Sequence, residues 1–317
     1  MRPLPQLRRN TLIAGAALAL LLSTVGCDSG DSGDSGGPQG TGDGTAALHD
    51  RLPERIRDAG KIVVSNPLKN PPYAFLEADG KTLRGIAPDL SRALEPLLGV
   101  EFEWVDTPFP GLIPGLQAGR FDMIWGSITD TEEREKVLDF VDYHMDGALL
   151  LVQSGNPRQI SGLDSACGLG VGALSGSIQI EMLEDQSARC ESAGRSKVDV
   201  RVYPDVPGGL TAVRSGQATA FFAGVGAARY QAAVAPDAFD TAGPIYRASP
   251  FGAGVRKDDR ALTEAIQAGL KQLVADGTYA EVLDRYGMGL TALEADQILI
   301  NGAARLNQEV LEIDSSP

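Results

Sequence analysis

The sequence of 317 residues has few of the side chains that most often hold metal ions. It contains two histidines, His49 and His144, and three cysteines, and these five residues are scattered along the chain. A zinc site needs about four such ligands held together, and no spacing typical of a calcium-binding loop is present. We therefore expect no metal and no cofactor, with a metal site made only of carboxylates as the alternative that the composition leaves open.

The sequence is also short of positive charge. Its 28 lysines and arginines stand against 42 aspartates and glutamates, which gives a net charge of -14 at pH 7. Nucleic acids bind basic surfaces because their phosphates are anionic, so this balance argues against nucleic-acid binding. The length exceeds what a single hydrophobic core usually serves, so two lobes or domains are expected.

Long apolar runs are scarce too, and the most prominent one lies at the beginning of the chain. Residues 11–25 form an apolar stretch that is shorter than the roughly 20 residues a membrane-spanning helix needs. Arg2, Arg8 and Arg9 precede it. A basic start followed by a short apolar core is typical of an export signal, so residues 1–27 are interpreted as a signal peptide. The arginine pair is compatible with twin-arginine export, and the choice between that route and the general secretory route stays open.

The apolar stretch ends in Thr-Val-Gly-Cys at residues 24–27, which resembles the cleavage box of bacterial lipoproteins. This resemblance implies that Cys27 carries lipid and anchors the mature chain to the cell membrane on its extracytoplasmic side. Thr24 departs from the pattern, which usually has leucine there, and an ordinary secretory signal is the alternative. Residues 28–48 are mostly Gly, Ser and Asp, which bury too little surface to offset chain entropy, so they are predicted to form a flexible tether.

Two cysteines remain after the tether, Cys167 and Cys190. In an exported chain two thiols most often pair, so we predict a disulfide between them. Such a bond is expected to stabilise the fold by roughly 3 kcal/mol. Two buried free thiols are the alternative.

The remainder of the chain alternates between strand-like and helix-like segments, which favours a mostly parallel sheet covered by helices on both faces. Strands are predicted at 61–65, 101–105, 122–125, 147–152, 168–172, 198–203, 218–223 and, in extended form, 249–259. Helices are predicted at 88–99, 111–119, 131–138, 178–183, 209–216, 261–275 and 279–286. Ligands in such sheets bind beyond the carboxyl ends of strands.

The segment Ser127–Arg134 follows the predicted strand 122–125 and gathers hydroxyl groups and one arginine at its carboxyl end. Thr131 has the spacing of a helix cap, which places Arg134 in the first turn of a helix, where a positive charge opposes the helix dipole. One interpretation is that Arg134 meets an anion, since a guanidinium grips a carboxylate with two parallel hydrogen bonds. The other is that it pairs with Glu133 or Asp130 on the surface.

Four segments of the chain resemble the family 3 extracellular solute-binding proteins, which are the polar amino-acid receptors of ABC importers. The segments are residues 85–90, 109–143, 171–177 and 210–224, and the resemblance covers about residues 55–290. It implies a two-lobe α/β fold of the type II periplasmic-binding-protein kind, with two crossover strands and the ligand in the cleft between the lobes. The divisions it implies are lobe I at 49–155 and 246–300, lobe II at 156–245, crossings at 153–157 and 244–248, and a C-terminal tail at 301–317.

The resemblance also assigns roles to residues of the cleft. Arg134 matches the arginine that holds the ligand α-carboxylate, and Thr129 matches the residue that supports the same carboxylate. Ser127 matches a position whose carbonyl meets the α-amino group. Phe109 matches an aromatic residue that packs on the ligand side chain. Ser177, at a predicted helix start in the other lobe, matches the hydroxyl residue that caps the carboxylate.

Departures from the family pattern bear on specificity. The family usually has an acid that binds the ligand ammonium where this chain has Gly224, and an aromatic residue where it has Asn70. Tyr73 stands at a position that usually holds a packing residue, and Trp125 stands where smaller residues are common, so it lies either in the cleft or in the core. An ammonium without its acid would be costly in a closed cleft. We therefore expect a ligand with a carboxylate that lacks a standard α-ammonium, unless Asp205 takes over the missing acid.

The function implied is that of the substrate-binding component of an ABC importer. It would act as a monomer, capture a small carboxylate-bearing solute and deliver it to a membrane permease. A sensor that signals to a membrane kinase is the alternative on the same site. A dehydratase-like enzyme on this fold is not expected, because the candidate cleft residues contain no Ser/His/Asp set.

Overall fold

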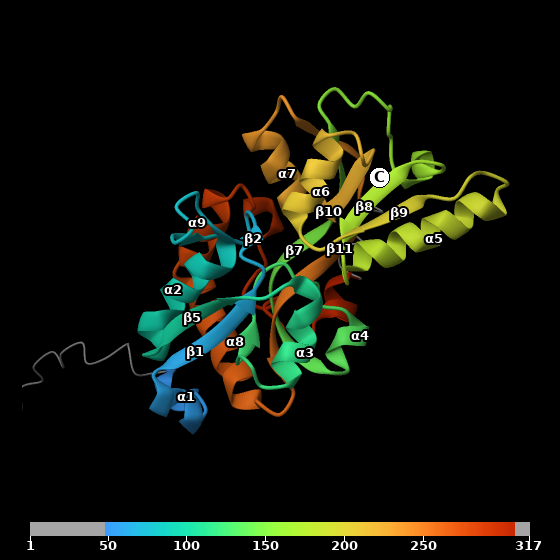
Figure 1. Ribbon diagram of the computed structural model, residues 1–317. Helices are drawn as coiled ribbons and strands as arrows, with labels where there is room; N and C mark the ends of the chain where they lie inside the picture. Colours follow the sequence, from blue (N-terminus) through green and yellow to red (C-terminus); the bar gives the residue numbers. More distant parts are fainter. Residues whose placement is uncertain (1–47, 308–317) are drawn as a thin grey trace, which may run out of the picture. The chain divides into compact units, whose positions relative to one another are not determined.

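The computed structural model of the protein describes residues 48–307 (Figure 1). The predicted signal peptide, Cys27 with its predicted lipid, nearly all of the predicted tether and the end of the tail lie outside the described residues. None of the helices described over residues 48–307 is both long and apolar enough to cross a membrane.

The described chain forms one large and one small β-sheet. The large sheet has eight strands in the order β5-β1-β6-β11-β7-β10-β8-β9, and the small one has three in the order β2-β3-β4. The strands are β1 (Lys61–Asn66), β2 (Lys69–Asn70), β3 (Ala74–Leu76), β4 (Leu83–Arg84), β5 (Glu101–Asp106), β6 (Met123–Ile124), β7 (Leu138–Gln153), β8 (Gly170–Leu174), β9 (Asp199–Tyr203), β10 (Ala220–Gly224) and β11 (Phe239–Arg256). The helices are α1 (Glu54–Ala59), α2 (Ile86–Leu98), α3 (Leu112–Gln117), α4 (Glu132–Glu135), α5 (Ile178–Ser192), α6 (Val206–Arg214), α7 (Val225–Val234), α8 (Arg260–Ala275) and α9 (Thr278–Arg285).

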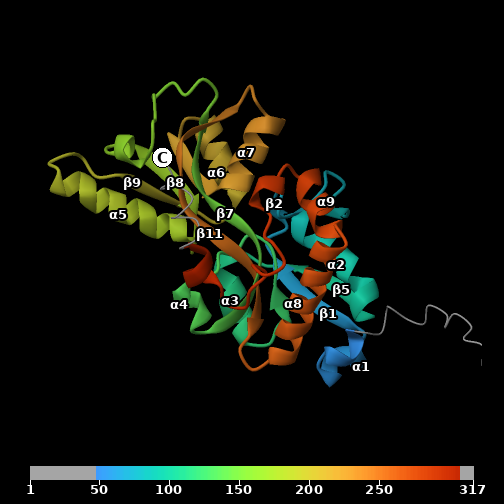
Figure 2. The ribbon, with the colours of Figure 1, turned by 180° about the vertical axis from the view of Figure 1, so that it is seen from behind.

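One end of the large sheet, made of β5, β1 and β6, carries what we call the first lobe. These three strands run parallel, and α2, α8 and α9 lie together beside them, as Figure 2 shows from behind. Helix α2 forms because Leu90, Leu94 and Leu98 recur at helical spacing and are fully buried in the core. Gly99, in a left-handed conformation with φ 66°, ends the helix.

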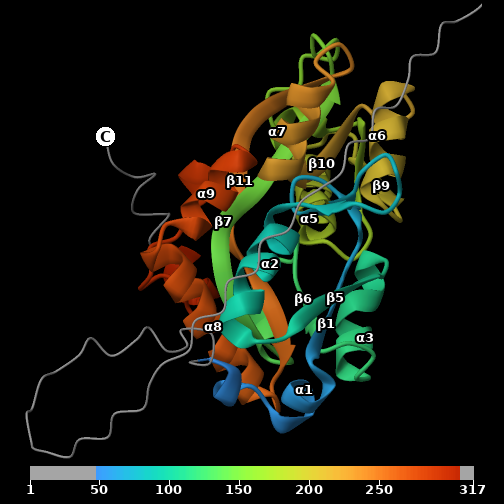
Figure 3. The same cartoon turned by 90° about the vertical axis from the view of Figure 1, so that its left-hand side faces the viewer.

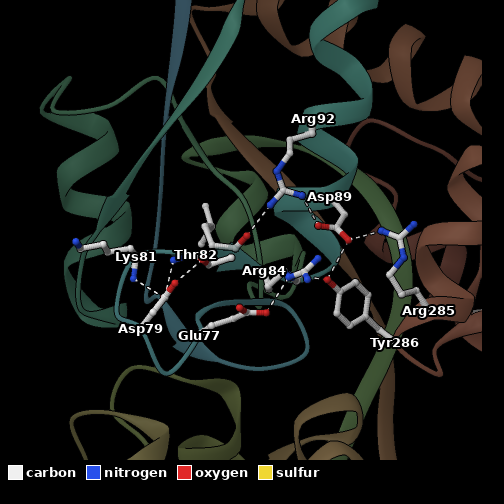
Figure 4. Close-up of polar contacts among 11 residues, drawn as sticks. Glu77, Asp79, Lys81, Thr82, Arg84, Asp89, Arg92, Arg285 and Tyr286 are labelled. Atoms are coloured by element: carbon white, nitrogen blue, oxygen red, sulfur yellow. Dashed lines mark hydrogen bonds and ion pairs between the residues drawn. The ribbon is translucent and has the colours of Figure 1, made fainter. Parts of the chain in front are cut away.

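A buried carboxylate joins two helices of the first lobe. Asp89 on α2 accepts hydrogen bonds from Arg285 Nη1 at 2.6 Å and from Tyr286 Oη at 3.0 Å, both at the end of α9 (Figure 4). Tyr286 Oη also accepts from the Gly85 amide at 2.9 Å, just before α2 begins. Arg92 forms an ion pair with the other oxygen of Asp89. The start of α2 is therefore fixed against the end of the distant α9.

The other end of the large sheet, made of β10, β8 and β9, carries the second lobe. These strands are also parallel, and α5, α6 and α7 cover them (Figure 1). The core of this lobe includes the fully buried Val171, Leu183 and Phe222. A disulfide joins Cys167, just before β8, to Cys190 on α5, with 5.7 Å between their Cα atoms. The predicted disulfide is thus confirmed.

Strands β7 and β11 run antiparallel to each other through both lobes (Figure 3). In the first lobe residues 138–142 of β7 pair with 252–256 of β11, and in the second lobe residues 148–152 of β7 also pair with β10. The pairing of β7 with β11 shifts register between residues 242 and 252. The pairing of β7 therefore changes between residues 142 and 148, ahead of the segment 153–157.

The helix predicted at 131–138 is much shorter in the structure. Helix α4 covers only Glu132–Glu135, and β7 begins at Leu138. The capping signal at Thr131 is real, because its hydroxyl accepts from the Arg134 amide at 3.2 Å. The helix stops because the residues that follow Val137 are taken into the centre of the large sheet, between β11 and β10.

Candidate functional site

A cavity of about 40 Å³ lies between the two lobes, at the carboxyl ends of β6 and β10. Eight of the nine residues predicted for the cleft line it. They are Asn70, Tyr73, Phe109, Ser127, Thr129 and Arg134 from the first lobe, and Ser177 and Gly224 from the second. Arg134 is the only charged side chain in this lining, and the lining holds no histidine and no carboxylate.

The ninth residue, Trp125, does not line the cavity. Its side chain is fully buried in the first-lobe core, where its ring lies 6.0 Å from that of Phe102 and 6.0 Å, edge-on, from that of Tyr143. The prediction of Trp125 as a ligand-binding residue is therefore wrong, and the alternative of a core tryptophan holds.

A sharp turn after β6 brings the serine and threonine of the first lobe to the cavity. Gly126 makes this turn with φ 151°, and a Cβ at this position would lie 2.0 Å from Nδ2 of Asn66, so only glycine fits. Ser127 follows, and its hydroxyl accepts from Asn70 Nδ2 at 2.8 Å. The other amide atom of Asn70, Oδ1, is buried and has no partner among the described residues. It is thus an acceptor that a ligand can satisfy.

Arg134 reaches across the cleft from α4. Its Nη1 donates to the carbonyl of Thr129 at 2.9 Å, and its Nη2 donates to the carbonyl of Gly176 in the second lobe at 3.3 Å. The guanidinium also lies 5.8 Å from the centre of the Phe109 ring. Burial lowers the pKa of Arg134, while the charge of Glu181 acts in the opposite direction.

The predicted alternative for Arg134, a surface ion pair, is not what the structure shows. Glu133 pairs with Lys136 instead, and within residues 48–307 the guanidinium hydrogen-bonds only to carbonyl groups. Carbonyl groups carry no net charge, so the positive charge inside the cleft has no direct counter-ion there. An anionic group is the natural complement, because charge-assisted hydrogen bonds to a carboxylate are stronger than those to a carbonyl.

The second lobe contributes the start of α5. Ser177 is the N-cap residue of this helix, and its buried hydroxyl oxygen has no hydrogen-bond partner in the described structure. Helix N-termini have free amides and a partial positive charge. Ser177 and the first turn of α5 therefore face the cavity with groups suited to an anion.

Sequence reasoning missed Asp146, an acid on β7 next to the cavity wall. Its carboxylate accepts hydrogen bonds from the Tyr73 hydroxyl, from the Gly147 amide at 2.6 Å and from the Val225 amide at 2.9 Å. Burial raises the pKa of Asp146 to about 6, and these hydrogen bonds work in the opposite direction. The neighbouring His144 is also buried, which lowers its pKa to about 4.

The acid proposed as a substitute for Gly224, Asp205, lies elsewhere. It is the N-cap residue of α6, where its carboxylate accepts from the Gly208 amide at 2.8 Å, and it does not line the cavity. Asp146 is closer to the position in question, since a Cβ placed on Gly224 would lie 3.5 Å from its Oδ2.

A second group of carboxylates, also missed, joins the C-terminal segment to the first lobe. Asp142 accepts from the Gly302 amide at 3.0 Å, and Glu135 accepts from the Ala303 amide at 3.2 Å. Asp130 lies beside both, fully buried. Burial, together with the neighbouring carboxylates, raises the pKa of Asp130 above the ordinary range. Burial also raises the pKa of Asp142, although its hydrogen bond with Asp130 acts in the opposite direction.

The fold and the cleft can now be compared with known proteins. The sequence profile of the bacterial extracellular solute-binding proteins, family 3, matches residues 62–289. The chain belongs to this family. Its two lobes, its two crossing strands and the position of the cavity agree with that membership.

Individual family 3 relatives are similar over most of their length. The arginine-binding protein ArgT of Corynebacterium glutamicum is 28% identical over 251 residues, which cover 79% of this chain and 81% of ArgT. The lysine/arginine/ornithine-binding periplasmic protein of Escherichia coli is 30% identical over 76% of this chain and 90% of its own. Among solved structures, an ancestral amino acid-binding protein described as a precursor of cyclohexadienyl dehydratase has a TM-score of 0.66 at 27% identity, and the match covers 74% of this chain and 98% of that one.

Proposed function

We propose that this protein is the substrate-binding component of an ABC importer, and that it captures an amino acid or a similar small carboxylate-bearing solute and delivers it to a membrane permease. The observation that carries the proposal is Arg134, the only charged side chain in the lining of the interlobe cavity. Its guanidinium reaches into the cleft without a counter-ion of its own.

The proposed site contacts the ligand carboxylate and also packs against the ligand. Arg134, the amide or hydroxyl of Thr129 and Ser177 at the start of α5 would hold the ligand carboxylate, and the aromatic ring of Phe109 would pack on the ligand. The names of relatives support amino acids as the class, because ArgT and the lysine/arginine/ornithine-binding protein are both named for amino acids that include arginine.

Capture would require the lobes to part. The cavity of about 40 Å³ has walls from both lobes, so a ligand can enter it when the lobes separate. The hydrogen bond from Arg134 to Gly176 joins the lobes across the cleft. We propose that opening bends β7 near residues 143–147 and β11 near residues 244–251. The second lobe then covers about residues 148–245, and the first lobe is made of the chain before and after it.

The location follows from the family, whose members are extracellular. We propose that the chain is exported by its signal peptide, anchored by lipid on Cys27 and held by the tether of residues 28–48. A binding role is favoured over catalysis on this site, because the lining offers no histidine or carboxylate for acid–base chemistry. This holds even though one structural neighbour is described as the precursor of a dehydratase.

Titration calorimetry of the purified protein, unfolded and refolded to release bound ligand, tests the proposal. We expect at least one of the standard amino acids, with L-arginine first in the panel, to bind. Arg134→Ala should weaken that binding by at least about 30-fold, in line with the roughly 2–5 kcal/mol that loss of a buried charge partner costs.

The matched control is Arg158→Ala, which removes an exposed arginine of the second lobe and should leave affinity unchanged. Arg134→Lys keeps the charge and loses the planar fork, so it should bind with intermediate affinity. Amino-acid affinity that survives Arg134→Ala would refute the proposed site.

A further inference from the structure

Asp146 is a charged group whose place in the fold calls for an explanation. It is buried on β7, and none of the ion pairs formed within residues 48–307 includes it. Its hydrogen-bond donors are one side chain, that of Tyr73, and the amides of Gly147, Val225 and Gly226. A buried carboxylate without a cation is unusual, because desolvation disfavours the charge.

Tyr73 lies between this acid and the cavity. The tyrosine lines the cavity, and its hydroxyl donates to Asp146 Oδ2. Two glycines make room for that hydroxyl, since a Cβ placed on Gly224 would lie 2.9 Å from Tyr73 Oη, and one on Gly226 would lie 2.6 Å from it. Gly224 has φ -59°, which any residue adopts. Glycine at 224 is therefore explained by the space that Tyr73 occupies and not by backbone conformation.

The direction of this hydrogen bond determines whether the Tyr73 hydroxyl can accept a hydrogen bond from a ligand in the cavity. Because Tyr73 gives its proton to Asp146, the phenol oxygen is left to accept hydrogen bonds, and with the Ala227 amide donating to it, one lone pair remains for a ligand. Donation to a carboxylate in a buried setting polarises the hydroxyl and makes its oxygen a better acceptor. The negative charge of Asp146 thus acts at the cavity wall by polarising the Tyr73 hydroxyl.

We infer that the Tyr73 hydroxyl, positioned by Asp146, accepts a hydrogen bond from the ammonium group of an amino-acid ligand whose carboxylate Arg134 holds. The inference rests on the proposed function and names its substrate class as amino acids with a free ammonium. It replaces the expectation, drawn from Gly224 alone, that the ligand lacks this group. Tyr73 is the contact residue, and Asp146 acts through it.

The competing explanation is that Asp146 serves only as a cap. Gly224 is the N-cap of α7 and has no side chain, and Asp146 bonds the first amide of that helix, Val225, from the neighbouring strand. Such a role would make Asp146 important for stability and leave Tyr73 without any preference between ligands. The two explanations therefore differ in how affinity depends on the ligand ammonium.

Calorimetry with matched ligand pairs separates them. The probes are L-arginine with 5-guanidinopentanoate, which lacks only the α-ammonium, and L-glutamine with 5-amino-5-oxopentanoate, which differs in the same way. In Tyr73→Phe we expect the affinity for the amino acid of a pair to fall by about 10- to 100-fold, as for the loss of a hydrogen bond to a charged group. The affinity for its deaminated partner should change less than about threefold. Tyr279→Phe, which removes the hydroxyl of another buried tyrosine outside the cavity lining, is the control.

The pH profile gives a second readout. The groups that interact with Asp146 are Tyr73 from the first lobe, Tyr143 on β7 and the uncharged start of α7, and His144 stacks on the ring of Tyr73. The pKa of His144 is about 4, and burial raises those of both tyrosines, so among these groups only Asp146, with a pKa of about 6, titrates between pH 5 and 8. Amino-acid affinity should fall as the pH is lowered through this range, and Asp146→Asn should flatten the profile.

Each outcome is decisive. A selective loss for the amino-acid member of a pair in Tyr73→Phe, with a flattened profile in Asp146→Asn, supports the inference. Equal losses for both members, or a wild-type preference for the deaminated probe, overturn it while leaving the importer proposal intact. If no probe and no standard amino acid binds the wild-type protein, the proposed function fails and the inference fails with it.

Discussion

The close approach of Gly224 to Tyr73 makes a prediction about stability that needs no ligand. In Gly224→Ala the new Cβ would lie 2.9 Å from Tyr73 Oη, which is closer than real Cβ contacts, so the phenol must move. Moving it strains a packed site, at about 1–3 kcal/mol for overpacking, and weakens the hydrogen bond to Asp146. Alanine also lowers the conformational entropy of the unfolded chain relative to glycine, which stabilises the folded state by about 0.4–1 kcal/mol. We expect Gly224→Ala to reduce the free energy of unfolding by about 1–2 kcal/mol.

The decisive measurement is a double-mutant cycle with Tyr73→Phe. Without the hydroxyl, the nearest ring atom of residue 73 would be Cζ, which lies 3.7 Å from the new Cβ in an ordinary contact. Adding Gly224→Ala to Tyr73→Phe should therefore cost less than about 0.5 kcal/mol, so the two changes should not be additive. Denaturant unfolding of the four proteins, with the slope of each transition compared, measures the interaction.

Gly226→Ala is the contrasting control for this cycle. Its Cβ would lie 3.0 Å from Tyr73 Cζ and 2.9 Å from Met288 Cε. Gly226→Ala should therefore lower the free energy of unfolding both in the wild-type protein and in Tyr73→Phe. Additive effects of Gly224→Ala and Tyr73→Phe would refute the reasoning, because they would show that the two residues do not compete for the same space.

Other predictions concern stability elsewhere in the fold. Burial holds the pKa of Asp142 above its unfolded value, so the folded protein keeps a proton that the unfolded chain releases, and stability falls by up to about 1.4 kcal/mol per pH unit as pH rises towards the folded pKa. Urea unfolding at pH 5, 7 and 9 should show this slope, and Asp142→Asn should reduce it; an unchanged slope would contradict the assignment. Replacing Cys167 and Cys190 together by alanine should cost about 2–5 kcal/mol, and a melting temperature equal to that of the oxidised wild type would show that the bond does not stabilise the second lobe. A chain that ends before Asn301 should melt at a lower temperature in a thermal scan, because Asp142 loses its amide partner; no change would mean that the C-terminal segment is dispensable.

Much of this architecture could be predicted from local patterns. The strands at 61–65 and 101–105 and the helix on Leu90 and Leu94 follow from apolar spacing, and the structure places them within a few residues of the expected bounds. The position of the cavity was predictable as well, because Ser127 and Thr129 follow a buried strand directly. These features depend on residues that are close in sequence.

The parts that were missed depend on residues far apart in sequence. Asp146 touches Tyr73 and Val225, which lie 73 and 79 residues away, and no local pattern indicates either contact. The only signal was an acid in β7, and because Asp139 and Asp142 lie in the same strand, it did not single out Asp146. The short α4 has the same cause: Thr131 caps a helix locally, but pairing with β11 draws the chain from Leu138 into the sheet. Trp125 was ambiguous because a strand end faces both core and cleft.

The place of β11 in the large sheet has a consequence for how the chain is made. β11 lies between β6 and β7 at the centre of the sheet order, yet it is the last of the eight strands in the sequence. The strands of the first lobe are synthesised early, but β6 can pair with β11 only after about residue 256 has been synthesised. The second lobe has β8, β9 and β10 in one continuous stretch, so it completes its parallel half-sheet earlier. Domains generally fold as units in the order of synthesis, but here the lobe that begins first should be the one that finishes last.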